Sequence, residues 1–174
     1  MISEQLINIT QGEFVAISSS TVCVTTVLGS CVAACLWDEN AEVGGMNHIL
    51  MPESTRKPEE LNRYGVNSME ILINEIIKKG GSKKSLQAKV FGGASMMQRL
   101  GDVGKRNAEF VLRFLEAEGI PCRAKSLGGT RARRIQFWPA SGKARQKFLG
   151  LQSDLQEPFA LKPKTIQGNS VELF

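Results

Sequence analysis

Short apolar runs rich in β-branched residues alternate with small polar turns over the first third of the chain. This pattern predicts four strands, at residues 13–17, 21–28, 31–37 and 42–50. The turn at residues 38–41 is short enough that we expect the last two strands to pair as an antiparallel hairpin. The two arms of this hairpin are nearly equal in length, so residues 31 and 48 should lie side by side near its open end.

Two later segments carry apolar residues at helical spacing. The first stripe is Val66, Met69, Leu72, Ile73, Ile76 and Ile77, and Lys78-Lys79-Gly80-Gly81 ends that helix. The second stripe is Ala108, Val111, Leu112 and Leu115, and it stops before Gly119-Ile120-Pro121. Further strands are predicted at residues 86–91, 123–127 and 134–138. The pattern therefore indicates an α+β fold of mainly antiparallel strands, with two helices whose apolar faces pack on the sheet.

Length and composition are those of one globular domain. The chain has 174 residues, of which 42% are hydrophobic and 22% charged, and its apolar runs are too short to cross a membrane. Residues 1–150 are expected to form the domain, and residues 151–174 lack periodicity and are predicted to be a C-terminal tail. Four cysteines without a signal-peptide pattern indicate a cytoplasmic protein with reduced thiols.

The formal net charge of +5 indicates an acidic partner surface. Much of the excess lies late in the chain, in Arg123, Lys125, Arg131, Arg133, Arg134, Lys143, Arg145 and Lys147. A run of charges is more often a solvated face than a nucleic-acid site. Few aromatic residues accompany these cations, so the stacking platforms of a nucleic-acid-binding sheet are absent from the pattern.

Cys31 and His48 are the candidates for chemistry. His48 is the only histidine in the chain, and an imidazole is the side chain best suited to take the proton of a thiol near neutral pH. Cys31 follows a Gly29-Ser30 turn, where backbone N–H groups can point at a developing oxyanion. Thr25, on the preceding strand, could orient the ring through its hydroxyl or its carbonyl.

Each of these residues also has a purely structural explanation. Most free cysteines are small buried hydrophobes, a lone histidine is usually a satisfied polar group, and threonine is a good strand former. A metal site is not favoured, because Cys31 and Cys35 would lie about 13 Å apart along an extended strand. The glycine pairs Gly92-Gly93 and Gly128-Gly129 match no nucleotide-binding motif and are more often sharp turns or close contacts. No cofactor is expected.

Several blocks of the sequence resemble the CheD family of chemoreceptor glutamine deamidases. The blocks are Leu28-Gly29-Ser30-Cys31-Val32, Gly44-Gly45-Met46-Asn47-His48-Ile49-Leu50-Met51-Pro52, Phe91-Gly92-Gly93-Ala94, the segment 101–107 and the arginine-rich segment 128–137. They occur in the family's order over residues 12–149. Ser95 and Ala132 are departures, since the family often has asparagine and glycine there.

The resemblance implies a single domain built as a layered α/β/β sandwich that hydrolyses receptor glutamines to glutamates. It assigns Cys31, His48 and Thr25 as the catalytic triad, and Gly29, Ser30 and Asn47 as supporting or oxyanion residues. Phe91, Gly92, Gly93, Ser95, Arg131 and Arg133 are predicted to form a substrate or partner surface. The implied partners are the cytoplasmic helices of methyl-accepting chemotaxis receptors and a CheC-type phosphatase, with the protein itself a monomer.

Two other functions are compatible with the same residues. The chain could be a non-catalytic regulator that binds a receptor or phosphatase through this surface. It could also be an unrelated thiol hydrolase that acts on small amides or esters. The fate of receptor glutamines, with and without Cys31, separates the three.

Overall fold

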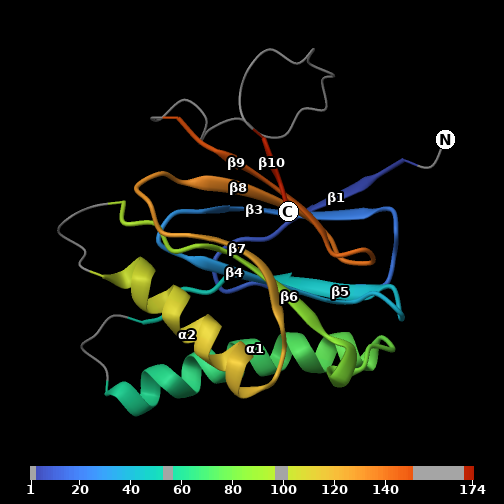
Figure 1. The fold of residues 1–174 in the computed structure, drawn as a ribbon, viewed down its shortest axis with the longest axis horizontal. Helices are drawn as coiled ribbons and strands as arrows, with labels where there is room; N and C mark the ends of the chain where they lie inside the picture. Colours follow the sequence, from blue (N-terminus) through green and yellow to red (C-terminus); the bar gives the residue numbers. More distant parts are fainter. Residues whose placement is uncertain (1–2, 53–56, 97–101, 151–170) are drawn as a thin grey trace.

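The fold is an α/β/β sandwich, so the predicted layers and the predicted α+β class are confirmed (Figure 1). The structure is a computed structural model that describes residues 3–52, 57–96, 102–150 and 171–174. The first sheet, called sheet A, has the strand order β1-β3-β8-β9-β10, and the second, sheet B, has the order β2-β5-β4-β6-β7. Among the described strands, six of the eight pairs are antiparallel, and β1–β3 and β6–β7 are parallel.

The strands of sheet A span β1 Gln5–Asn8, β3 Val22–Leu28, β8 Arg133–Trp138, β9 Lys143–Phe148 and β10 Glu172–Leu173. The strands of sheet B span β2 Phe14–Ile17, β5 Val43–Asn47, β4 Val32–Asp38, β6 Gln87–Gly92 and β7 Cys122–Leu127. The predicted strands agree with β2 to β8 to within one to three residues at their ends. The strands β1, β9 and β10 have no predicted counterpart, because their sequences lack a clear apolar alternation.

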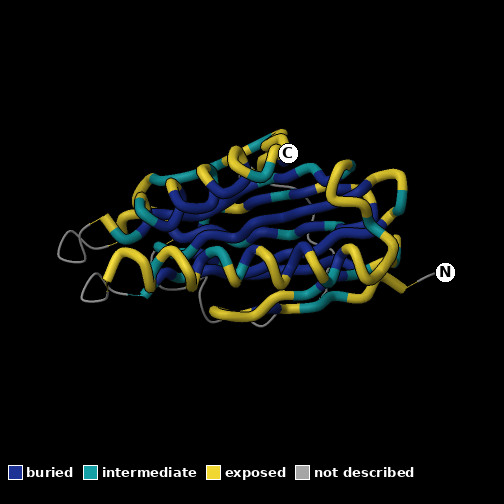
Figure 2. Tube along the Cα trace, turned by 90° about the horizontal axis from the view of Figure 1, so that it is seen from below, coloured by how far each residue is buried: buried dark blue, intermediate teal, exposed yellow. Residues whose placement is uncertain are grey.

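Both helices pack on the outer face of sheet B (Figure 1). They are α1 Pro58–Lys78 and α2 Val103–Ala117, and the predicted apolar stripes supply the buried residues Met69, Leu72, Ile73, Ile76, Val111 and Leu115. Figure 2 shows the buried positions concentrated on the strands and the exposed ones on the outward sides of the helices. Neither helix has an apolar stretch long enough to span a bilayer within the described parts of the chain.

The strand pleat divides the core into two layers. Even-numbered residues of β4, such as Val32, Ala34 and Leu36, pack under the helices. Odd-numbered residues of β4, such as Ala33 and Cys35, pack instead between the two sheets. A side chain's parity along a strand therefore decides which layer it enters.

The last described residues return to sheet A. The strand β10 pairs antiparallel with β9, and the ring of Phe174 lies 5.3 Å from that of Phe91 in the layer between the sheets. Residues 151–170, most of the predicted tail, lie outside the described residues. The boundary at residue 150 and the role of the tail stay predictions.

Candidate active site

Cys31 and His48 lie on the same face of sheet B. The hairpin register pairs Cys35 with Met46, and the bridge between Val32 and Ile49 continues that register past the end of β5. Cys31 and His48 each precede one member of this bridge, so they are diagonal neighbours across the two strands, with Cα atoms about 7–8 Å apart. Side chains alternate between the two faces of a strand, and Cys35 and Met46 face sheet A. Cys31 lies four residues before Cys35 and His48 two residues after Met46, so both of their side chains also enter the layer between the sheets.

The imidazole of His48 is held by sheet A. Its Nδ1 lies 2.8 Å from Oγ1 of Thr26 on β3, and the Thr26 hydroxyl in turn donates to the carbonyl of Ile9 at 2.7 Å. A hydroxyl has one proton, and the Ile9 carbonyl can only accept. The Thr26 oxygen must therefore accept from Nδ1–H, which leaves Nε2 of the neutral ring with a free lone pair.

Thr26, not Thr25, makes this contact, and the predicted catalytic role of Thr25 stays a prediction. The Thr25 hydroxyl donates to the carbonyl of Ile135 at 2.8 Å, and the Thr25 carbonyl accepts the N–H of Ile9 at 3.0 Å. Neighbouring side chains on a strand point to opposite faces, so Thr25 and Thr26 cannot both face His48. The apolar residues Val24 and Leu28 share the inward face with Thr26.

Burial leaves both members of the pair neutral near pH 7. Desolvation raises the pKa of the half-buried Cys31 thiol above its ordinary value, and the backbone N–H of Cys31 itself partly opposes this rise. Desolvation also lowers the pKa of His48 below 6.5, although the charge of Glu13 pulls it upward. The resting site is therefore a thiol beside an unprotonated base.

The turn before Cys31 is fixed through its carbonyl groups. The carbonyl of Gly29 accepts from the N–H of Ala94 at 2.9 Å, and the carbonyl of Cys31 accepts from the N–H of Gly93 at 2.8 Å. The carbonyl of Ser30 accepts from Nδ2 of Asn107 at 2.9 Å. Within the described chain no oxygen accepts the N–H groups of Ser30 and Cys31, so these two donors remain available.

The Asn47 side chain lies on the helix side of sheet B, and its predicted supporting or oxyanion role stays a prediction. Its Oδ1 accepts the N–H of Ala34 at 3.0 Å and its Nδ2 contacts the sulfur of Met69, both on the helix side of sheet B. The β4–β5 ladder is interrupted between Cys35–Met46 and Val32–Ile49. The Asn47 amide thus fills a gap in the ladder next to His48.

Four of the six residues predicted to form a partner surface are buried, and three of them lie on β6 or directly after it. Phe91 is fully buried between the sheets. Gly92 and Gly93 are also buried and have φ angles of +112° and +66°, and a Cβ on Gly92 would lie 2.2 Å from the carbonyl oxygen of Cys31. Only glycine fits there, because the turn of Cys31 approaches that backbone closely.

Arg133 is also buried, at 1% exposure, which corrects its predicted place on a binding surface. Its guanidinium donates to the carbonyls of Ser126 and Gly128, and it stacks over Phe148. Burial lowers the pKa of the Arg133 guanidinium from its ordinary value. Ser95 and Arg131 are exposed, so their predicted role at a surface stays a prediction.

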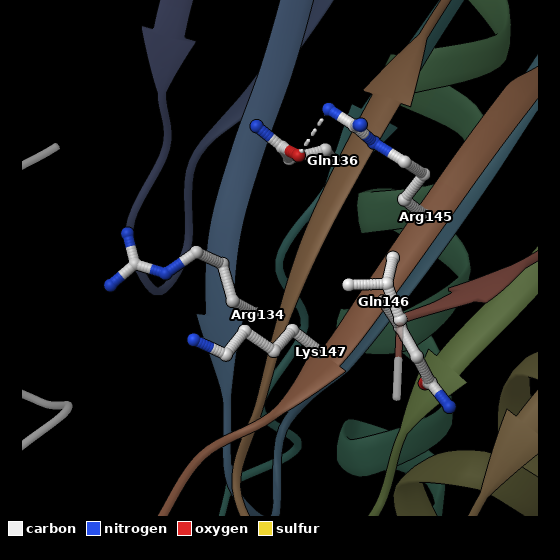
Figure 3. Close-up of a pocket in the computed structure, with 6 residues that line it drawn as sticks. Arg134, Gln136, Arg145, Gln146 and Lys147 are labelled. Atoms are coloured by element: carbon white, nitrogen blue, oxygen red, sulfur yellow. Dashed lines mark hydrogen bonds between the residues drawn. The ribbon is translucent and has the colours of Figure 1, made fainter. Parts of the chain in front are cut away.

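A second feature lies on the outer face of sheet A, which neither helix covers. A pocket of about 140 Å³ is lined by Arg134, Gln136, Arg145, Gln146, Lys147 and Val171. Figure 3 shows Arg134 and Lys147 projecting the same way from neighbouring strands, with Arg145 bonded to Gln136 farther along. Arg134 pairs with Val27 in the sheet, close to the Gly29–Cys31 turn, but its side chain is on the opposite face from Cys31.

Fold and site together define a sandwich in which the half-buried thiol of Cys31 and the neutral imidazole of His48 enter the layer between the sheets from neighbouring strands, and a thiol with an imidazole is the pairing that thiol hydrolases use. The sequence model of the CheD family, described as "CheD chemotactic sensory transduction", matches residues 50–148. The chain belongs to the CheD family, and the predicted family is confirmed.

Curated relatives agree with this assignment. The chain is 44% identical over 173 residues to a "Probable chemoreceptor glutamine deamidase CheD" of Caulobacter vibrioides, covering 97% of this chain and 92% of the relative. It is 49% identical over 143 residues to a protein of the same name from Cereibacter sphaeroides, covering 82% of this chain and 72% of that one. The corresponding protein of Acidiphilium cryptum is 50% identical over 147 residues, covering 82% and 77%.

Among solved structures, the hypothetical protein YfiH of Bacillus licheniformis aligns with a TM-score of 0.43 and 12% identity. That alignment covers 72% of this chain and 60% of that one. A likeness this distant supports no argument about function.

Two residues at the site carried no functional prediction. Thr26 was hidden because its neighbour Thr25 offers the same hydroxyl, and only the packing of the sheets distinguishes the two faces. Asn107 had a usable signal, since it lies four residues before Val111 within the apolar stripe of α2. A polar residue inside such a stripe indicates a buried hydrogen-bonding role.

Proposed function

We propose that this chain hydrolyses the side-chain amides of glutamines on chemoreceptor cytoplasmic helices to glutamates, with Cys31 as nucleophile and His48 as base. The curated relatives are named for this activity. The observation that carries the proposal is the hydrogen-bond chain from His48 through Thr26 to Ile9, which leaves Nε2 able to accept a proton. A base that is already unprotonated near pH 7 is what a neutral thiol needs.

The reaction begins with proton transfer from the Cys31 thiol to Nε2 of His48. The thiolate attacks the carboxamide carbon of glutamine, and the C=O electron pair moves to oxygen to form a tetrahedral oxyanion. The N–H groups of Ser30 and Cys31, which no oxygen of the described residues accepts, are suited to bind that oxyanion. The imidazolium returns its proton to the nitrogen, which leaves as ammonia, and a thioester remains.

Hydrolysis of the thioester completes the cycle. His48 takes a proton from water, the hydroxide attacks the thioester carbon, and the Cys31 sulfur leaves and is reprotonated. The net change adds one water, releases one ammonia and leaves a glutamate. Thr26 acts as the positioning residue, because it holds Nδ1–H and so keeps Nε2 turned away from sheet A.

The basic pocket on sheet A is the surface we assign to the receptor. Arg145 and Lys147 line it from the outer face of β9, and β9 pairs with β8, the neighbour of the strand β3 that ends at the Gly29–Cys31 turn. A cationic surface attracts acidic helices and speeds their encounter. A CheC-type phosphatase, which the resemblance to the family implies, is a second proposed partner, and the monomer is the proposed working state.

The proposal is tested by incubating a receptor cytoplasmic fragment with the wild-type protein, with Cys31→Ala and with Cys122→Ala. Each converted glutamine gains about one dalton, because an NH2 group is exchanged for OH on hydrolysis. We expect conversion with the wild type and with Cys122→Ala, whose thiol is exposed and remote from His48 in the sheet, and none with Cys31→Ala. Binding of all three proteins without any mass change would favour the non-catalytic regulator. Ester hydrolysis with receptor glutamines left intact would favour an unrelated thiol hydrolase.

A further inference from the structure

Asn107 is a completely buried polar residue on α2 that contacts the turn of the active site. Its Oδ1 accepts the N–H of Met51 at 3.0 Å, and its Nδ2 donates to the carbonyl of Ser30 at 2.9 Å. One amide thus joins the helix to the segment after His48 and to the residue before Cys31.

The bond to Ser30 constrains the N–H of Cys31. The carbonyl of Ser30 and the N–H of Cys31 belong to one planar trans peptide, so they point in opposite directions. Holding that carbonyl toward α2 turns the Cys31 N–H away from α2. The direction agrees with the proximity of this N–H to the Cys31 sulfur, where it opposes the rise in the thiol pKa.

Close backbone packing fixes Asn107 relative to the turn. A Cβ on Gly104, one turn earlier in α2, would lie 2.5 Å from the carbonyl oxygens of Gly93 and Ala94. Gly93 in turn donates its N–H to the carbonyl of Cys31 at 2.8 Å. The helix therefore cannot withdraw from the Cys31 turn without breaking these contacts.

We propose that Asn107 is a positioning residue that aims the backbone N–H of Cys31 at the oxyanion formed when the thiolate attacks a carbonyl group. This role rests on the proposed function and names a further part of the same site. Asn107 touches neither the substrate nor the reacting atoms, and it acts through the Ser30–Cys31 peptide. Without it, that peptide could rotate, and the oxyanion would lose a fixed donor.

The test compares two reactions of the same sulfur in the wild type, Asn107→Asp and Asn107→Ala. Acylation by p-nitrophenyl acetate passes through an oxyanion, whereas alkylation by iodoacetamide displaces iodide and forms none. Asn107→Asp keeps an acceptor for Met51 but cannot donate to Ser30 as a carboxylate. We expect the acylation rate of both variants to fall by about 10²-fold, the range found when one oxyanion donor is removed. The limiting alkylation rate at high pH should stay within about twofold, because the thiolate itself is intact.

Receptor deamidation is measured on the same proteins, and kcat should fall with KM nearly unchanged. If acylation and alkylation fall in parallel, or if neither changes, the inference is overturned, since Asn107 then either supports only the fold or has no such role. Cooperative thermal unfolding of each variant shows whether a parallel loss is loss of fold. If the wild type does not deamidate the receptor but acylation still falls selectively in the variants, the proposed function fails and the inference on Asn107 stands.

Discussion

Thr26 of sheet A and His48 of sheet B are joined by a hydrogen bond of 2.8 Å between Oγ1 and Nδ1. The bond crosses the interface between the two sheets, and it sets the tautomer of the only imidazole in the chain. The ability of His48 to act as a base therefore depends on the packing of the two sheets as well as on the hairpin that contains it.

Replacing Thr26 by Val should impair catalysis while the corresponding change at Thr25 should not. Thr26→Val keeps the shape but removes the acceptor for Nδ1–H, so we expect kcat to fall about 10-fold to 100-fold, part of the roughly 10²–10⁴-fold that acid–base catalysis supplies. Thr25→Val also loses one buried hydrogen bond, to Ile135, at a cost of about 1 kcal/mol. Steady-state deamidation and urea unfolding of both variants give the comparison. Equal kcat in the two would contradict the assignment of Thr26.

The activity should be lost on the acid side at a pH below 6.5. Burial lowers the pKa of His48 from 6.5, and the reaction needs this ring unprotonated. The rate should therefore remain high near pH 7 and fall only when the pH passes below the lowered pKa. A pH profile of kcat/KM for the free enzyme measures it, and an acid midpoint above 6.5 would show that the ring is not desolvated.

The free energy of unfolding should fall on the acid side, as the activity does. Because the folded protein binds the His48 proton more weakly than the unfolded chain does, the stabilisation is fully present above pH 6.5. It is lost as the pH falls toward the lowered pKa. Urea unfolding at about pH 7.5 and about pH 5.5 should show a lower free energy of unfolding at the acid value. In a His48→Asn variant, the free energy of unfolding should differ less between the two pH values than in the wild type. If it differs by the same amount, other titratable groups cause the effect.

The four cysteines should differ in reactivity toward iodoacetamide. Cys23 and Cys35 are fully buried, and desolvation raises the pKa of Cys23 to about 12, so both should label only on unfolding. Cys31 should react before the exposed Cys122, because His48 takes its proton. Mass mapping of partially labelled protein gives the order. Labelling of Cys31 should slow in His48→Ala, and an unchanged rate there would contradict His48 as the base.

Gly92→Ala should destabilise the protein more than Gly119→Ala. Both glycines have a positive φ, which costs an alanine about 1–2 kcal/mol. A Cβ at Gly92 also meets the Cys31 carbonyl, whereas one at Gly119 meets nothing within 4 Å. We expect an additional loss of about 1–3 kcal/mol from this overlap, together with loss of deamidation. Urea unfolding compares the two variants, and equal losses would mean that the Cys31 turn yields to the added methyl group.

Reversing charge in the basic pocket should weaken receptor binding without changing the chemistry. Lys147→Glu should raise KM several-fold at low salt and leave kcat nearly constant, because rim charges act mainly on association. The control is Lys84→Glu, an exposed lysine outside the pocket. The difference between the two variants should shrink as salt screens the charges. Identical KM values for the two variants would indicate that the receptor docks on another face of the protein.

The hairpin that carries Cys31 and His48 followed directly from its sequence, since apolar runs and a short polar turn leave few alternatives. The strands β1 and β9 did not, because the inward residues of β9 are Ala144, Gln146 and Phe148 among charged neighbours. Their burial depends on strands far away in the sequence, so no local pattern indicates them. Because β1 was not predicted from the sequence, the role of the Ile9 carbonyl that follows it, which accepts the Thr26 hydroxyl, could not be predicted either.

The site residues divide in the same way. Cys31 and His48 were identifiable because chemistry restricts them to one thiol at a turn and one imidazole. Choosing between Thr25 and Thr26 requires knowing which face of β3 meets sheet B, a property of the tertiary packing. Arg133 looked like part of a charged surface, and only the positions of Ser126, Gly128 and Phe148 explain its burial.

The imidazole of His48 belongs to sheet B, and its orientation is set by Thr26 of sheet A. Proton transfer therefore depends on the distance between the two sheets. Small side chains such as Ala33 and Ala144 occupy that interlayer space. Enlarging one of them would spread the layers and stretch the contact between hydroxyl and imidazole. Remote substitutions in the interior can thus tune the rate of this enzyme, although they lie outside its reacting groups.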